Sequence, residues 1–201
     1  TGSDPTETVS GYSFAEARRT RIFWMFCAIQ FLFLPSLATI PLHIVVHGMD
    51  LGMTATVAAA LVSTMALASV LARLAVGSFF DRVGGKGALI LCLVPLLASL
   101  LALLVVNTPK SLFAVIVVYG FAHGGLFTVM SPVVAEYFGL KAHGTLFGSI
   151  IFFGAISGSV APVLAGYIFD TTGSYSMAFN FLIAMASSGL ILTLVLPKRR
   201  A

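Results

Sequence analysis

The sequence predicts an all-helical (all-α) polytopic membrane protein with six transmembrane helices. Of its 201 residues, 59% are hydrophobic and only 9% are charged, whereas a soluble domain carries about 25% charged residues. Six long stretches lack Lys, Arg, Asp and Glu, apart from one arginine in the second. Each exceeds the roughly 20 residues that a helix needs to cross a bilayer. Because backbone groups in lipid must be hydrogen-bonded within their own segment, these stretches are expected to be helices.

Charged residues separate the expected spans and mark where each apolar stretch stops. In chain order the spans cover residues 22–49, 51–80, 87–109, 111–135, 142–169 and 171–197. In the same order they stop at Asp50, Asp81, Lys110, Glu136, Asp170 and Lys198. All six lengths leave room for a tilted crossing with short connections between the helices.

The loop charges predict how the chain is oriented in the membrane. Six spans place the connections alternately on two sides, and basic residues gather on one of them: Arg18, Arg19, Arg21, Arg82, Lys86, Lys141, Lys198, Arg199 and Arg200. The other side holds only Lys110. Since basic loops stay on the cytoplasmic side, both ends of this segment are expected to be cytoplasmic, in a plasma or inner membrane.

The charge balance and the motifs exclude several classes of function. The sequence pI of about 9.3 follows from the positive loops that topology requires, so nucleic acid is not an expected partner. The sequence contains no metal-ligand spacing, phosphate-binding loop or nucleophile–base pair. Neither a cofactor nor an enzymatic activity is therefore expected.

Arg73 is the one charged residue in the middle of an apolar stretch. It lies eight residues before Asp81, which in a helix is about 12 Å inside the span and near the bilayer centre. A cation at that depth costs at least about 2.5 kcal/mol and usually faces a cavity with a function. A guanidinium grips a planar carboxylate with two hydrogen bonds, so Arg73 predicts the binding of a small organic anion. The structural alternatives are an ion pair with an acid outside this chain and snorkelling to the cytoplasmic edge.

Five other polar residues within the spans are candidates to line the same cavity: Gln30, His43, Ser69, Tyr119 and His123. His43 follows Pro41 near the outer end of its span, and its imidazole could bind a carboxylate or carry a proton. Tyr119 and His123 are four residues apart and share a helix face. The alternatives are a histidine bonded to a backbone carbonyl for His43, a satisfied core histidine for His123, and an amide that ties two helices together for Gln30.

A glycine-rich motif with a charged centre follows the second span. It reads Gly77-Ser-Phe-Phe-Asp81-Arg82-Val-Gly84-Gly85-Lys86. This motif resembles the G-x-x-x-D-R-x-G-R-R/K signature of the major facilitator superfamily, in the loop after the second helix of each six-helix half. Gly85 stands where a basic residue is more usual. The alternative is an ordinary polar turn.

Several residues of the motif have expected roles in contacts between helices. Gly77 would allow close contact with a neighbouring helix. Asp81 would accept hydrogen bonds from the free N–H groups at the N-terminus of another helix. Arg82 and Lys86 would pair with acids such as Glu136. Together these contacts would form a cytoplasmic gate.

Four further segments narrow the resemblance: residues 16–24, 41–52, 136–148 and 165–175. Their order and spacing resemble the C-terminal half, helices seven to twelve, of a monocarboxylate-transporter-like or oxalate/formate-antiporter-like protein. The resemblance implies a twelve-helix bundle in which an N-terminal six-helix half is the partner of this one. It also implies two inverted three-helix repeats, 21–106 and 111–196. Residues 1–20 would be the tail of the central cytoplasmic loop with a leading segment, and residues 21–200 the six-helix half.

The resemblance also implies how substrate is held. In the family, an arginine four residues before the signature glycine grips the substrate carboxylate, and Arg73 and Gly77 have this spacing. Many members have Asp or Asn four residues before the arginine, where this chain has Ser69, so that proton acceptor is absent. Oxalate exchangers carry a lysine in the eleventh helix, whereas residues 146–169 contain no Lys or Arg. This difference indicates a substrate with one carboxylate, unless the other half supplies a second cation.

Together these features predict a secondary active transporter that moves a small monocarboxylate across the membrane by alternating access, coupled to protons or by exchange. Its expected partners are the organic anion, protons, the lipid bilayer and the N-terminal six-helix half. Two other functions stay open. One is a facilitator for a neutral or cationic solute, with Arg73 in a structural ion pair. The other is a non-transporting membrane sensor or assembly module.

Overall fold

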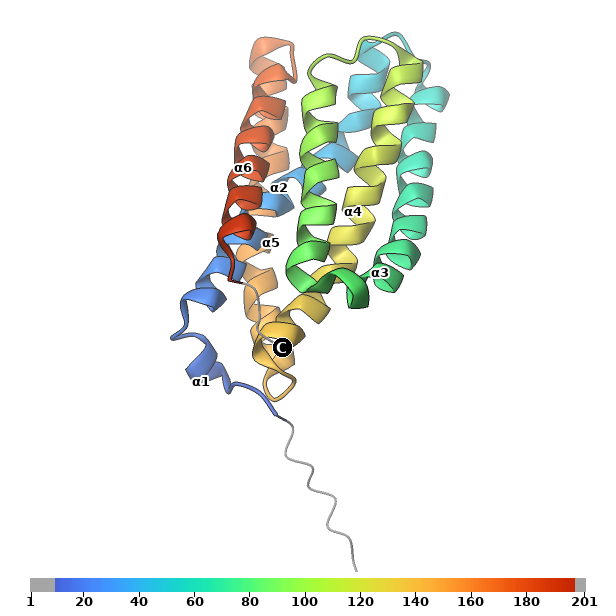
Figure 1. Cartoon of the computed structure of the whole chain (residues 1–201). Coiled ribbons are helices and arrows are strands. Elements are labelled where there is room, and N and C mark those ends of the chain that lie inside the picture. The colour runs from blue at the N-terminus through green and yellow to red at the C-terminus, as the bar shows by residue number, and fades with distance from the viewer. Residues whose placement is uncertain (1–9, 198–201) are drawn as a thin grey trace, which may run out of the picture.

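The computed structural model describes residues 10–197, most of which are helical (Figure 1). In chain order the helices are α1 (Phe14–Ala17), α2 (Arg21–Asp50), α3 (Ala55–Leu103), α4 (Pro109–Phe138), α5 (His143–Thr172) and α6 (Ser176–Val195). Five of them, α2 to α6, are long and apolar enough to cross a membrane. The predicted all-helical fold with several membrane passes is therefore confirmed.

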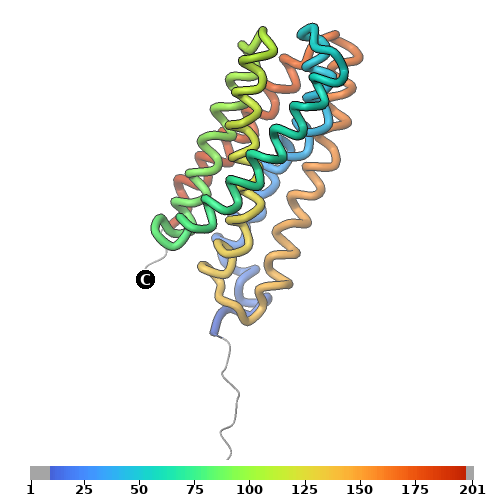
Figure 2. Tube along the Cα trace, turned by 90° about the vertical axis from the view of Figure 1, so that its right-hand side faces the viewer, coloured from blue at the N-terminus to red at the C-terminus, as the bar shows by residue number. Residues whose placement is uncertain are grey.

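The longest helix, α3, consists of two passes. Its 49 residues would reach about 74 Å as a straight helix, more than twice the apolar thickness of a bilayer. Gly84 breaks it with φ 69° and ψ 167°, a conformation that glycine adopts readily because it has no Cβ. The chain turns back there, and the limbs 55–83 and 85–103 run in opposite directions, as the teal and green segments of Figures 1 and 2 show. The five long helices thus contain six long helical segments.

Two of the predicted boundaries are wrong. The sequence predicts a connection over residues 81–86, but the helix continues to Val83 and resumes at Gly85, so that Gly84 alone makes the turn. It also predicts that the sixth span begins at residue 171, whereas α5 runs to Thr172 and ends at Gly173, with φ 67°. Both errors have one cause. A charged residue marks the membrane edge, while a helix ends where a glycine lets the backbone turn.

The leading segment carries structure that its polar composition does not predict. The Ser13 hydroxyl accepts the Glu16 N–H at 3.3 Å, and the Glu16 carboxylate accepts the Ser13 N–H at 2.7 Å, which makes a capping box for α1. Hydrogen bonds from the Ser13 hydroxyl and from its N–H lower the pKa of Glu16. Just before α1, the Tyr12 N–H donates to the Phe138 carbonyl at 2.8 Å. The incoming chain is therefore fastened to the C-terminal end of α4.

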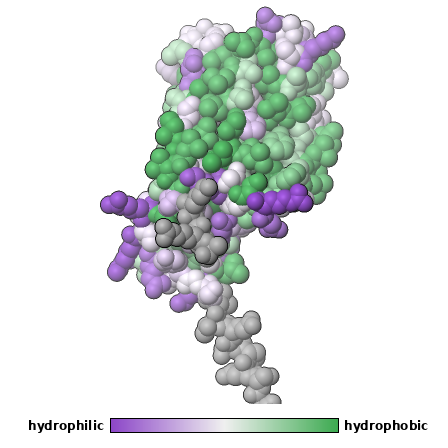
Figure 3. All heavy atoms as spheres, viewed as in Figure 1, coloured by the Kyte–Doolittle hydropathy of each residue, from purple (hydrophilic) through white to green (hydrophobic). Residues whose placement is uncertain are grey.

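The passes pack mainly as two close pairs. Helix α2 lies against α5 and α3 lies against α4, while α6 packs on both α2 and α3. The side chains between them are buried and apolar, for example Phe26, Phe33, Leu61, Leu96, Ile116, Leu126 and Ile150. The face drawn in Figure 3 is a hydrophobic band between two hydrophilic ends, the pattern expected where lipid covers the sides of a bundle. Helix α1 and the C-terminal end of α6 lie toward the same end of the bundle (Figure 1).

Two glycines bring α3 and α4 into backbone contact. A methyl group at Gly124 would overlap the carbonyl group of Ser69, and one at Gly120 would lie 2.7 Å from the carbonyl oxygen of Met65. Small residues let helices approach closely, and this close packing drives helix association in lipid. Ser69, and Arg73 one turn after it, are thereby held against the middle of α4.

Gly124→Ala is expected to destabilise the bundle by about 1–3 kcal/mol, because the added methyl group forces the backbones of α3 and α4 apart. Gly166→Ala in α5 is the matched control. Its methyl group would lie 3.6 Å from the nearest atom, in the His43 ring, which is an ordinary contact. Thermal unfolding of both variants in detergent measures the difference, and equal loss of stability would contradict the backbone contact.

Candidate functional site

Arg73 lies in the first limb of α3 with its side chain on the surface of this half. It is eleven positions before Gly84, about 16 Å along the helix from the turn. Leu71 and Leu74 beside it are 58% and 69% exposed, so this face of α3 is open. Within residues 10–197 the guanidinium makes no hydrogen bond or ion pair. An uncompensated cation therefore lies well inside a membrane-length pass, on an open face.

The structure brings two more of the predicted residues next to Arg73. Ser69 lies one turn before it on the same face of α3, and its hydroxyl oxygen is 3.3 Å from Nδ1 of His123 on α4. His123 is half-buried and lies within electrostatic range of Arg73. The close approach of the helices at Gly124 holds these residues together. Arg73, Ser69 and His123 are called the Arg73 cluster below.

Phe127, which the sequence analysis missed, adds an apolar wall to the Arg73 cluster. Its ring centroid is 5.0 Å from that of His123, and its side chain is 49% exposed. The spacing of four residues between His123 and Phe127, which places them on one helix face, was the available signal. A cation, an imidazole and an aromatic face at one place can hold a small anion that has an apolar part.

Tyr119 and Gln30 lie inside the half rather than on its open face. Tyr119 is fully buried, and its hydroxyl donates to the Ser36 carbonyl at 3.0 Å, which ties α4 to α2. Its ring still lies beside His123, with centroids 5.9 Å apart. Gln30 is 2% exposed and packs on Gly154 of α5, and its Oε1 has no hydrogen-bond partner among the described residues. In this conformation both residues are part of the packed interior.

His43 is hydrogen-bonded through both ring nitrogens. Nε2 lies 3.0 Å from the Pro162 carbonyl oxygen on α5, and Nδ1 lies 3.1 Å from the Tyr175 hydroxyl. A carbonyl oxygen only accepts, so Nε2 carries the hydrogen, and in the neutral ring Tyr175 donates to Nδ1. The histidine bonded to a backbone carbonyl, one of the two interpretations of the sequence, is the arrangement found. Tyr175 is 132 residues from His43, so no local pattern indicates this contact.

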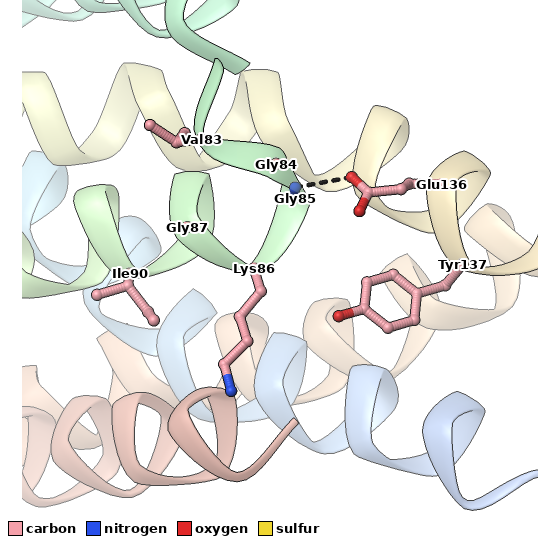
Figure 4. A pocket seen from close by; sticks show the side chains of 8 residues that line it. All are labelled: Val83, Gly84, Gly85, Lys86, Gly87, Ile90, Glu136 and Tyr137. Carbon is pink, nitrogen blue, oxygen red and sulfur yellow. Dashed lines mark hydrogen bonds between the residues drawn. The ribbon is translucent and has the colours of Figure 1, made fainter. Parts of the chain in front are cut away.

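The predicted pairing of Arg82 with Glu136 is not formed in this structure. Glu136, at the end of α4, instead accepts the backbone N–H of Gly85 at 2.7 Å (Figure 4). Arg82 is exposed, and its Cζ lies 5.8 Å from the centre of the Phe79 ring. The first N–H groups of the second limb of α3 have no helical partner, so a carboxylate there satisfies a donor and faces the positive end of a helix. A rule that pairs opposite side-chain charges does not detect this backbone donor.

The same contact explains the glycine that departs from the superfamily signature. A Cβ atom at Gly85 would lie 2.6 Å from Oε2 of Glu136 and 3.0 Å from a methyl group of Val133. Any larger residue at this position would displace the carboxylate from the backbone N–H. The basic residue that is usual in the signature therefore does not fit this turn.

Lys86 reaches across to the end of α6. Its Nζ donates to the carbonyls of Leu194 and Leu196, both at 2.6 Å, and the Tyr137 hydroxyl donates to the Pro197 carbonyl at 2.7 Å. Lysines near a helix C-terminus satisfy its last carbonyls in this way. A cavity of about 400 Å³ lies beside Lys86 and Tyr137 (Figure 4). The motif thus fastens α3, α4 and α6 together through bonds to backbone groups.

Gly77 and Asp81 lie on the open surface of the half. A methyl group at Gly77 would meet no atom within 4 Å. The Asp81 side chain is exposed and has no partner among residues 10–197. The predicted helix contact of Gly77 and the predicted helix N-terminus for Asp81 are therefore not found within the described part of the chain. Both residues follow Arg73 at intervals of four, so they continue its open face toward the end of the limb.

Comparison with known proteins supports the resemblance noted from the motif. Residues 22–201 match the Major Facilitator Superfamily. Monocarboxylate transporter 7 of Homo sapiens is 33% identical over 181 residues, which cover 88% of this chain and 34% of the relative. Monocarboxylate transporter 13 of Bos taurus is 33% identical over 156 residues, covering 76% and 37%. Sialic acid transporter NanX of Escherichia coli is 28% identical over 149 residues, covering 73% and 36%. The chain spans about a third of the length of these relatives.

Solved structures show the same fold. A crystal structure of FucP in its outward conformation aligns with a TM-score of 0.76 over 93% of this chain and 46% of FucP, at 16% sequence identity. A second, described as the E. coli fucose:proton symporter FucP, aligns with the same TM-score and coverage at 15% identity. At such identities the likeness establishes the fold alone. With this fold, and with the match over residues 22–201, the chain belongs to the major facilitator superfamily, a family of membrane transporters rather than enzymes.

Proposed function

We propose that the chain is the C-terminal six-helix half of a twelve-helix secondary active transporter, which moves a small monocarboxylate by alternating access. The observation that carries the proposal is Arg73, whose guanidinium has no partner in the described chain and lies well inside a pass on an open face. The relatives support the substrate class, since two proteins named monocarboxylate transporters match 76% and 88% of the chain.

The surroundings of Arg73 suit one carboxylate. A guanidinium on an open face presents its planar N–H edge for two parallel hydrogen bonds to a carboxylate. Ser69 and His123 add a hydroxyl and an imidazole one turn away. Helix α5 (His143–Thr172) has no Lys or Arg for a second carboxylate. A bound monocarboxylate would neutralise Arg73 and so lower the cost of closing the site away from water.

The remaining half would enclose the open face of α3. The chain covers about a third of its curated relatives and 46% of FucP, which leaves room for a second bundle in those proteins. In the proposed transporter each half consists of two inverted three-helix repeats, here 21–106 and 111–196, and substrate binds near the midplane between the halves. The nine basic loop residues on one side and the single one on the other support cytoplasmic ends in a plasma or inner membrane.

In this proposal the motif Gly77–Lys86 is the cytoplasmic gate, and its residues divide into two sets. Gly85 and Lys86 are fastened within the half, to Glu136 and to the end of α6. Gly77, Asp81 and Arg82 are exposed, so they are available to the other half. Contacts of the exposed set would form and break as the halves rock, while the fastened turn keeps its shape.

A transporter of a neutral or cationic solute is the second candidate. The fold is shared with FucP, which is described as a fucose:proton symporter. In such a transporter Arg73 would be paired permanently with an acid of the other half. The cation would then be structural, and removing both members of the pair would be tolerated better than removing one.

Arg73→Ala in the full-length protein is expected to lower uptake of a labelled monocarboxylate at least about 30-fold, because removing one member of a desolvated charge pair costs about 2 kcal/mol or more. Arg73→Lys should restore only part of the activity, since an ammonium cannot make the two parallel bonds. Lys110→Gln, which removes an exposed cation at the start of α4, is the control and should keep normal uptake.

Surface expression of each variant separates a transport defect from a folding defect. Normal uptake by Arg73→Ala would contradict the substrate role of Arg73. Recovery of uptake when an acid in the other half is also removed would establish the structural ion pair instead.

The fastening of the gate can be tested through stability. Glu136→Ala leaves the Gly85 N–H without its partner and is expected to cost about 1–3 kcal/mol. Gly85→Ala is expected to destabilise by displacing the same carboxylate, so that its cost should fall by at least about 0.5 kcal/mol when Glu136 is already alanine. Unfolding of the two single variants and the double variant in detergent completes the cycle. Strictly additive effects would show that the two positions do not interact.

A further inference from the structure

His123 differs from the other three histidines of the chain. His43 is bonded through both ring nitrogens. His47 lies in the last turn of α2, and His143 begins α5, so both are at the ends of passes. His123 lies in the middle of α4 (Pro109–Phe138) and is half-buried. Only its Nδ1 is bonded, to Ser69, and Nε2 has no hydrogen-bond partner among the described residues.

Among residues 10–197, the groups around His123 leave it as the one neutral proton acceptor in this place. From α3 it faces Ser69 and Arg73, and from its own helix it is flanked by Tyr119 and Phe127. A guanidinium only donates hydrogen bonds and does not accept a proton. The Tyr119 hydroxyl is already donated to a backbone carbonyl.

No carboxylate competes for the proton in the middle of any described pass. The acidic residues of the long helices all lie near helix ends or at the Gly84 turn: Asp50, Asp81, Glu136 and Asp170. Helices α2, α5 and α6 place no charged side chain in the middle of their passes. Imidazole is also the side chain whose charge ordinarily changes between about pH 5 and 8.

We infer that His123 is the proton-binding site of the transporter and that Arg73 couples this proton to the substrate carboxylate. The inference rests on the proposed function. In the empty site the positive charge of Arg73 opposes a second positive charge on the neighbouring imidazole. A carboxylate bound at Arg73 cancels that charge, and His123 then accepts a proton from water on the side to which the site is open. On the other side the proton returns to water when the carboxylate leaves.

The coupling works in both directions. If the anion raises the affinity of His123 for a proton, a proton on His123 must raise the affinity for the anion by the same factor. The empty site and the doubly loaded site carry the same net charge, because the added proton and the added carboxylate cancel. A site loaded with the proton alone holds two neighbouring cations, which is the costly state. Protons therefore do not cross without the anion.

Ser69 is a positioning residue in this scheme. When Nδ1–H donates to the Ser69 hydroxyl, Nε2 keeps its lone pair free, and this nitrogen receives the proton. The backbone contact between Ser69 and Gly124 holds the hydroxyl in place. The imidazole therefore presents the same nitrogen in each cycle.

The test uses the full-length transporter in proteoliposomes with a labelled monocarboxylate. Uptake driven by an inward proton gradient, counterflow exchange at equal pH, and KM at external pH from roughly 5 to 8 are measured. In the wild type KM should rise with pH by up to about tenfold per unit, since one proton is linked to each anion. His123→Gln should lose accumulation driven by the gradient and the pH dependence of KM, while counterflow exchange stays measurable.

His143→Gln is the matched control. Its imidazole is also bonded to a serine, with Nε2 3.1 Å from the Ser131 hydroxyl, and it also lies beside a phenylalanine, Phe147. It lies at the end of a pass, however, away from the Arg73 cluster. This variant should keep both accumulation and the pH dependence of KM.

The outcomes separate the inference from the proposed function. Accumulation by His123→Gln under a proton gradient, or a wild-type KM that does not change with pH, overturns the inference and leaves the proposed function intact. A wild type that moves no monocarboxylate overturns the proposed function itself. If His123→Gln does not reach the membrane, proton uptake by the purified wild type on adding the anion decides: about one proton per anion supports the inference, and none overturns it.

Discussion

The backbone contact between α3 and α4 at Gly124 is the constraint on which the rest of the site depends. The hydrogen bond between the Ser69 hydroxyl and Nδ1 of His123 spans 3.3 Å, near the upper limit of such bonds. A side chain at Gly124 would push α3 away and break it. Lipid provides no hydrophobic force to hold two helices together, so closeness must come from small residues that let backbones touch. Gly124 thereby sets the distance between the Ser69 hydroxyl and the His123 imidazole.

The turn at Gly84, between the two limbs of α3, is held by polar bonds rather than by close packing of small residues. A single residue reverses the chain, and the backbone N–H that follows is capped by a carboxylate from another helix. Lys86 then satisfies carbonyls at the end of α6. These bonds involve backbone groups that would otherwise lack partners, so they are worth more than an exposed ion pair, which contributes about 0–1 kcal/mol. The turn keeps its shape without using the charged residues Asp81 and Arg82.

Composition and local pattern predict the fold of this chain well and its contacts poorly. The helical class and the long helical segments follow from the spacing of charged residues, because the bilayer imposes a minimum length on each span. Arg73 is conspicuous because it is the one charged residue in the middle of such an apolar stretch. The helix ends at Gly84 and Gly173 were misplaced, since backbone geometry rather than charge decides them. The motif indicated the family but not the bond from Gly85 to Glu136, because side-chain patterns do not reveal free backbone donors.

Long-range neighbours form the part of the site that the sequence does not show. Ser69 and His123 are 54 residues apart, and His43 and Tyr175 are 132 apart. Their contacts depend on which helix lies against which, and the periodicity of a single helix carries no such information. Both ring nitrogens of His43 are hydrogen-bonded, whereas Nε2 of His123 has no partner among the described residues. This difference between the two histidines depends on contacts between helices, which the sequence alone does not show.

The pairing of residues 10–12 with the end of α4 has a mechanical consequence. Two backbone hydrogen bonds hold residues 10–12 against the end of α4. The Tyr12 N–H donates to the Phe138 carbonyl, and the Leu140 N–H donates to the Ser10 carbonyl. Helix α4 also carries His123 and Glu136. The chain is therefore anchored on α4 before it enters α2. Residues 10–12 thereby tie the chain to the helix that bears both the His123 imidazole and the Glu136 carboxylate.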